Sequence, residues 1–175
     1  SGVVSAVAEL LRVGIVSENG RFNSEIKHPN LCQGEDSILE FVLISSEEAE
    51  MNRPITLTQK DIRAVQLAKG ALITGIELLC REAGLDHPEK LLVAGGFGSY
   101  LNERDAMTIG MFPRLPADDI QVVGNAAGEG AVLALLFPDY QKKAQEMAEN
   151  TRVIDLAADP LFQETFLNNL NYPKL

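Results

Sequence analysis

A short apolar run that ends in three glycines within four residues is the feature that most constrains the fold of this chain. Residues 91–94 read Leu-Leu-Val-Ala, which is typical of a buried strand. Gly95, Gly96 and Gly98 follow, and glycines permit φ > 0 and let another group approach the backbone without meeting a Cβ. The pattern predicts a strand, a tight turn and a helix capped by Ser99, whose free N–H groups favour an anion or a polar ligand edge. The alternative is a tight turn of an α/β sheet that binds nothing.

Two familiar glycine loops are excluded by these residues. Residues 96–101 lack the third glycine of the dinucleotide-binding fingerprint. The chain contains no Gly-Lys-Ser or Gly-Lys-Thr, so it has no P-loop lysine to hold phosphates. A nucleotide at this turn would therefore be met on its adenosine side, and other groups would have to hold its phosphates.

Size and charge narrow the class of protein. A chain of 175 residues is long enough for one domain with a core. The formal net charge of −10 argues against nucleic-acid and anionic-membrane partners. Cys32 and Cys80 form no C-x-x-C pair, and His28 and His87 add no metal-ligand spacing. We therefore expect no metal site and a reduced, cytoplasmic protein.

The first residues suggest a larger protein. Ser1-Gly2 leads at once into an apolar helical pattern without an initiator methionine. We therefore expect residues 1–175 to be one domain of a longer chain; a natural N-terminus processed after methionine is the alternative.

Periodicity and turn residues outline the elements. After a first helix that ends at Gly14, residues 21–36 look irregular. Thr58-Gln59-Lys60-Asp61 forms a capping box that opens the longest helix. Strands are expected at 37–44, 91–94 and 120–123, and further helices at 103–111, 124–137, 139–150 and 160–170.

The longest helix, over 59–83, carries an apolar stripe and a polar flank. Residues spaced by threes and fours form the stripe: Ile62, Val65, Ala68, Leu72, Ile76 and Leu79. Arg63, Gln66 and Lys69 lie to one side of it. A solvated flank is the simplest interpretation of these three residues.

No catalytic arrangement is visible in the sequence. Both histidines lie in expected loops, so a Ser-His-Asp site has no support. Phosphoryl transfer needs a phosphate cradle, a metal-holding carboxylate and a group that orients water, and none is evident. By itself the chain is expected to be half of a site, with no catalytic residue.

Several blocks in order resemble one family, the reductive activators of corrinoid-dependent methyltransferases and corrinoid proteins. The resemblance is to their C-terminal part and spans nearly the whole chain. Three blocks are specific together: Lys60-Asp61-Ile62-Arg63, Ala94-Gly95-Gly96-Phe97-Gly98-Ser99 and Gly124-Asn125-Ala126-Ala127-Gly128.

The resemblance implies an architecture and an activity. Such activators carry a plant-type 2Fe–2S ferredoxin domain, a linker region and a C-terminal ATPase domain of the acetate/sugar kinase, heat-shock chaperone and actin superfamily, which is α/β and ribonuclease H-like. They use ATP, with Mg²⁺, to drive reduction of a Co(II) corrinoid to Co(I) on a partner protein. The cluster cysteines, the linker and the first ATPase lobe would precede this helix-rich C-terminal lobe.

The resemblance also implies roles for named residues. Gly95, Gly96, Phe97, Gly98 and Ser99 match the superfamily's adenosine motif. If the superfamily geometry holds, the flank of Arg63, Gln66 and Lys69 faces that turn and one of them contacts the nucleotide. Non-redox kinase or chaperone-like ATPase lobes, and a non-catalytic docking module, are the competing interpretations.

A helix of small residues follows the expected strand at 120–123. Gly124, Ala127, Gly128 and Ala131 recur by threes and fours and match the superfamily's second connecting motif. Each glycine inside a helix costs about 1 kcal/mol relative to alanine, so the cluster needs a reason. One reason is close packing within this domain. The other is an inter-lobe hinge against the upstream lobe, which predicts an at least partly uncovered face in this chain.

Overall fold

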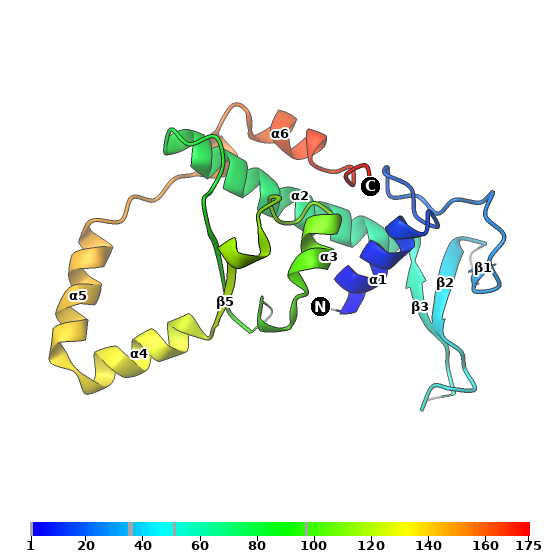
Figure 1. The fold of residues 1–175 in the computed structure, drawn as a ribbon, viewed down its shortest axis with the longest axis horizontal. Helices are drawn as coiled ribbons and strands as arrows, with labels where there is room; N and C mark the ends of the chain where they lie inside the picture. The colour runs from blue at the N-terminus through cyan, green and yellow to red at the C-terminus, as the bar shows by residue number, and fades with distance from the viewer. Residues whose placement is uncertain (1, 35–36, 51, 97) are drawn as a thin grey trace.

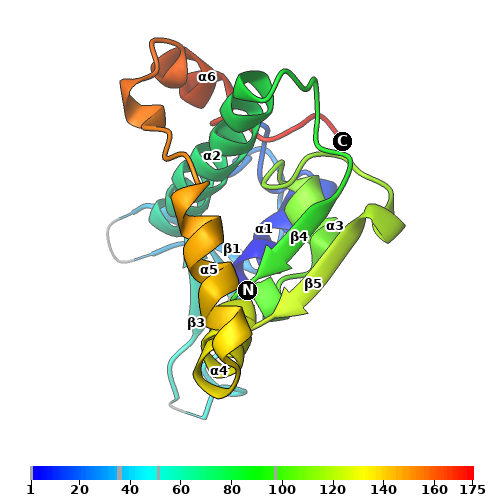
Figure 2. The ribbon, with the colours of Figure 1, turned by 90° about the vertical axis from the view of Figure 1, so that its left-hand side faces the viewer.

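The computed structural model describes residues 2–34, 37–50, 52–96 and 98–175. Figures 1 and 2 show a body of helices and a parallel strand pair, with an antiparallel sheet on one side and a two-helix arm on the other. The helices are α1 (Gly2–Arg12), α2 (Gln59–Glu82), α3 (Glu103–Thr108), α4 (Ala126–Leu136), α5 (Pro138–Glu149) and α6 (Phe162–Asn168). The strands are β1 (Leu31–Gln33), β2 (Leu39–Ile44), β3 (Ile55–Thr58), β4 (Leu91–Ala94) and β5 (Ile120–Gly124). The mixed α/β class expected from the sequence is confirmed.

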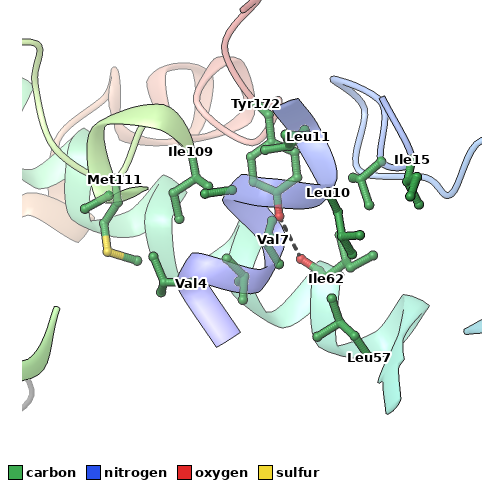
Figure 3. Close-up of a cluster of buried hydrophobic side chains, with 14 of the residues drawn as sticks. Val4, Val7, Leu10, Leu11, Ile15, Leu57, Ile62, Ile109, Met111 and Tyr172 are labelled. Carbon is green, nitrogen blue, oxygen red and sulfur yellow. Dashed lines mark hydrogen bonds between the residues drawn. The ribbon is translucent and has the colours of Figure 1, made fainter. Parts of the chain in front are cut away.

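The core lies where α1 packs against α2 and α3. Val7 of α1, Ile62 of α2 and Ile109, directly after α3, are fully buried. Tyr172, from the end of the chain, packs with them (Figure 3). Arg12, at the end of α1, donates to the Asp105 carboxylate of α3 at 2.9 Å. Buried apolar side chains therefore hold the three helices together, and one ion pair also links α1 to α3.

The capping box predicts the start of α2 correctly. The Thr58 hydroxyl accepts from the Asp61 N–H, and the Asp61 carboxylate accepts from the Thr58 N–H at 2.8 Å. Ala83 is the C-cap, and Gly84 follows with φ = +72°. These local signals need no tertiary contact, which is why the sequence shows them.

The apolar stripe expected along α2 is correct at its start and wrong further along. Ile62 and Val65 are buried, but Leu72 and Leu79 are 45% and 47% exposed. The stripe rotates onto a partly polar set: Gln66, Lys69, Gly70, Ile73, Thr74 and Leu78. Helical spacing is the same for both faces, and the segment that packs on α2 decides between them.

Two small sheets are present among the described residues. β1, β2 and β3 form an antiparallel meander that places Phe41 between Leu31 and Leu57. β1 lies in the stretch expected to be irregular, because three residues are too few for a periodic signal. β4 and β5 pair in parallel, with Leu91 opposite Ile120 and Val93 opposite Val122.

The helix expected at 103–111 begins at Glu103 as predicted but ends at Thr108. Residues 98–100 form a single 3₁₀ turn, and Asn102 caps α3 by accepting from the Asp105 N–H at 3.0 Å. The expectation that Ser99 caps this helix is therefore wrong. A second short polar residue three positions on supplies the acceptor.

Candidate nucleotide site and the α4–α5 arm

The two glycine-rich blocks of the sequence meet in space. The Gly95 N–H donates to the Gly124 carbonyl at 2.7 Å, at the carboxyl ends of β4 and β5. Both residues have positive φ, +96° and +65°, a conformation that favours glycine over residues with a Cβ. Ligands of α/β proteins bind outside the carboxyl ends of parallel strands, so this edge is the candidate site.

The glycines of the first block differ in what surrounds them. A Cβ built on Gly95 or Gly96 meets nothing within 4 Å among the described residues, and the same holds at Gly124. A Cβ on Gly98 would lie 2.5 Å from Val93 Cγ1, and Gly98 is buried. Gly98 is thus needed for packing, whereas Gly95 and Gly96 leave open space beside the backbone.

Two members of the predicted motif are only partly visible. Phe97 lies outside the described residues. Ser99 is described through its backbone, within the 3₁₀ turn. The role of both residues in binding therefore stays a prediction.

The arm starts at this edge. Asn125 is the N-cap of α4, and its side-chain oxygen accepts from the Gly128 N–H at 3.1 Å. A Cβ on Gly128 would overlap that side chain, so the cap itself accounts for one glycine. From the sequence, Asn125 was named only as part of a family block and not as a cap, although an Asn before a run of small residues is a usual N-cap signal.

The small-residue face of α4 is partly uncovered, as the hinge interpretation requires. Ala127 and Ala131 are exposed, and Gly124 and Gly128 are half-buried. The arm extends away from the body in Figure 1. Neither α4 nor α5 contains a buried residue, and Leu135 at 80% exposure is an apolar side chain left in solvent. The hinge role of this face stays a prediction.

The flank of α2 is not solvated at Gln66 and Lys69, each of which is 2% exposed. Gln66 Nε2 donates to the Asn19 carbonyl at 3.2 Å and to the Leu170 carbonyl at 3.1 Å, and Lys69 Nζ donates to the Asn171 carbonyl. The structure thus brings these two side chains to the end of the chain and not to the glycine turn. Their buried polar atoms bond elsewhere, so a nucleotide contact there stays a prediction without geometric support.

Arg63 is the exposed member of the flank. Its guanidinium lies 3.4 Å from the Gln66 side-chain oxygen. Burial lowers the pKa of neighbouring Lys69 to about 8, because an ammonium loses its hydration there. Of the three residues, Arg63 is the one with a side chain available to a ligand.

The residues present fit one of the expected cofactors and not the other. The open glycine edge, beside the N-terminus of α4, suits the approach of a nucleoside. A 2Fe–2S cluster needs four cysteine ligands, and this chain has two, Cys32 in β1 and Cys80 in α2. An iron–sulfur cluster of the ferredoxin type would have to lie outside this chain.

Comparison with known proteins identifies the domain. A family model described as the C-terminal domain of RACo, the ASKHA domain, matches residues 1–175. The corrinoid activation enzyme RamQ from Eubacterium limosum is 35% identical over 177 residues, which cover 97% of this chain and 30% of RamQ. A solved reductive activator for corrinoid, iron-sulfur protein superposes with a TM-score of 0.87 at 31% identity, over 97% of this chain and 27% of that one.

The chain is an ASKHA domain, the actin-like ATPase class, as its fold and paired glycine turns suggest. It belongs to the family of C-terminal domains of the RACo reductive activators of corrinoid proteins. The resemblance stated from the sequence is confirmed. The chain spans about a third of the length of the relatives it matches.

Proposed function

We propose that this chain is the nucleotide-binding C-terminal lobe of an ATP-dependent activator that returns a Co(II) corrinoid to Co(I) on a partner protein. The observation that carries the proposal is the hydrogen bond between Gly95 and Gly124, which unites two family blocks at one open strand edge. Gly95 and Gly96 would lie against the adenosine. Phosphates and Mg²⁺ would be held by the upstream lobe, because this chain carries no phosphate loop.

A physical reason for ATP accompanies this proposal. The Co(II)/Co(I) couple lies at very low potential, so electrons from an ordinary ferredoxin run uphill. A ligand can shift such an equilibrium only by its differential affinity for two states of the protein. Closure of two lobes around ATP would supply that difference, with the uncovered face of α4 as the moving contact.

The remaining partners and surroundings form part of the proposal. We infer a corrinoid protein or corrinoid/iron–sulfur protein as partner, the chain's own upstream lobe on the α4 face, and a 2Fe–2S cluster outside this chain. We also infer a cytoplasmic location with no nucleic-acid or membrane partner. Within the described ranges, no helix is long and apolar enough to cross a membrane.

Titration of the intact protein with ATP tests the proposed function directly. Saturable binding, and ATP-dependent formation of Co(I) on a corrinoid protein followed by its absorption spectrum, are expected. An intact protein that activates a corrinoid protein equally well without ATP would contradict the proposal.

Replacement of Arg63 tests the predicted role of the α2 flank. Arg63→Ala is expected to weaken ATP binding about fivefold with little change in thermal stability, because the side chain is exposed. The adjacent exposed Lys60→Ala is the matched control. Unchanged ATP affinity in Arg63→Ala would remove this flank from the site.

Replacement of Gly128 tests the hinge. Gly128→Leu in the intact protein is expected to slow ATP-linked activation at least fivefold, because a bulky side chain would block close approach of another helix. Leucine would also displace the Asn125 cap, which is worth about 1 kcal/mol. Asn125→Ala is therefore the control, since it removes the cap without adding bulk. Equal activation rates in the two variants would contradict the hinge.

A further inference from the structure

The end of the chain crosses α2 as a strap, which we define as residues 169–173. Tyr172 is its anchor: the side chain is 3% exposed, and its hydroxyl donates to the Ile62 carbonyl at 3.1 Å (Figure 3). The Tyr172 N–H donates to the Glu18 carbonyl, after α1, at 2.7 Å. The strap thereby joins α2 to the segment that follows α1.

Polar contacts continue along the strap. The Asn169 amide donates to the Thr74 hydroxyl at 3.2 Å and to the Glu77 carboxylate at 2.8 Å. Gln66 and Lys69 donate to the next two strap carbonyls, those of residues 170 and 171. A Cβ on Gly110 would lie 2.9 Å from Pro173 Cγ. The turn after α3 therefore packs closely against the strap.

The strap carries the one buried apolar side chain of a long described segment. From residue 121 to the end, Tyr172 is the one buried hydrophobic side chain within the part of the chain that the structure describes. α6, which leads into the strap, contains no buried residue. Segments held by few buried apolar contacts open locally at lower free energy than the core.

A cation is buried beneath the strap. Lys69 Nζ lies 5.5 Å from the centre of the Tyr172 ring and forms no ion pair with a carboxylate in the described ranges. The charged groups around this contact are Glu77 on α2, which favours the ammonium, and Arg63, which acts on Tyr172. A carbonyl and a ring face replace water only in part, so the closed strap holds the ammonium at a cost.

We propose that the strap opens and closes over α2 as one unit while the α1–α2–α3 core stays folded, with Lys69 as the positioning residue whose ammonium is buried on closing. Gln66 and Lys69 become available to another ligand only when the strap is open. Opening of the strap does not require ATP binding by this domain, because it depends on contacts within the chain alone.

The direction of the pH dependence follows from burial. With the strap closed, burial lowers the Lys69 pKa from its ordinary 10.5 to about 8. Opening the strap would return water to the ammonium and raise the pKa toward its ordinary value. Below pH 8 the lysine is charged in both states, so closing the strap carries the full cost of removing water from the ammonium. Between pH 8 and 10.5 the closed form gives up its proton first, so closing becomes more favourable as the pH rises. Linkage gives about a tenfold rise in closing between pH 7 and pH 9.

Hydrogen exchange on the intact protein tests the strap. At pH 7 the Tyr172 amide is expected to exchange at least a hundredfold faster than the buried amides of α1, after correction for intrinsic rates. Protection of the Tyr172 amide should rise about tenfold between pH 7 and pH 9. Lys69→Met should abolish that rise while the α1 amides keep their protection.

Tyr172→Phe is the matched second variant, because it keeps the ring over Lys69 and loses only the hydroxyl bond to Ile62. It should lower strap protection about fivefold and retain the pH-dependent rise. Exchange of the strap and α1 at one common rate would overturn the independent opening. A rise that persists in Lys69→Met, or disappears in Tyr172→Phe, would overturn the role of Lys69.

Discussion

Gly96→Val is expected to weaken ATP binding by the intact protein more than tenfold, or by over ~1.4 kcal/mol. The glycine is exposed at the end of β4, and a Cβ there meets nothing within 4 Å among the described residues. The valine side chain would therefore occupy space that a bound nucleoside needs, without disturbing the fold. Calorimetric titration with ATP, beside a thermal melt, measures both effects.

Gly98→Val is the informative comparison for that variant. Here the new Cβ would lie 2.5 Å from Val93 Cγ1 in a buried position, so the loss of stability should dominate. Overpacking of this kind costs about 1–3 kcal/mol. If Gly96→Val melts like the unmodified protein and binds ATP with the same affinity, the glycine turn is not part of a nucleotide site.

Ile62→Ala is expected to lower the free energy of unfolding by about 2–5 kcal/mol. Ile62 is fully buried and lies at the start of α2, where α1 and Tyr172 meet it (Figure 3). Truncation removes buried apolar surface and leaves a cavity in the middle of the core. Denaturant titration followed by circular dichroism gives the difference.

Leu67→Ala on the same helix is the control for Ile62→Ala. Leu67 is 44% exposed, and alanine is a better helix former than leucine, so the change should stay within about 0.5 kcal/mol. Comparable losses for the two variants would mean that the core is not centred on Ile62.

Local chemistry accounts for what could be predicted well. The capping box of Thr58 and Asp61 and the glycine stop at residue 84 are formed by neighbours in sequence, and both are present. The strands expected at 91–94 and 120–123 are present as β4 and β5, because each is a short, mostly apolar run bounded by turns. The family blocks identify the domain because they recur as ordered sets of residues, a signal that does not depend on knowing the packing.

The candidate site could be predicted only in pieces. Gly95 and Gly124 each stand out as glycines after an apolar strand, but their hydrogen bond depends on the parallel pairing of β4 with β5. The stretch between those two strands contains α3 and two short turns, and no local pattern states which strands become neighbours. The open edge at the carboxyl ends of β4 and β5 therefore depends on which strands the fold brings together.

The sequence by itself determined where most elements begin and end, the class of fold and the family, because these depend on residue type and spacing along the chain. Only the tertiary structure decided which face of α2 is buried. Gln66 and Lys69 carry polar groups that local periodicity assigns to solvent, yet both are buried where the strap supplies carbonyl acceptors from residues a hundred positions away. A polar side chain is buried when distant backbone satisfies it, and that partner is absent from any local window of sequence.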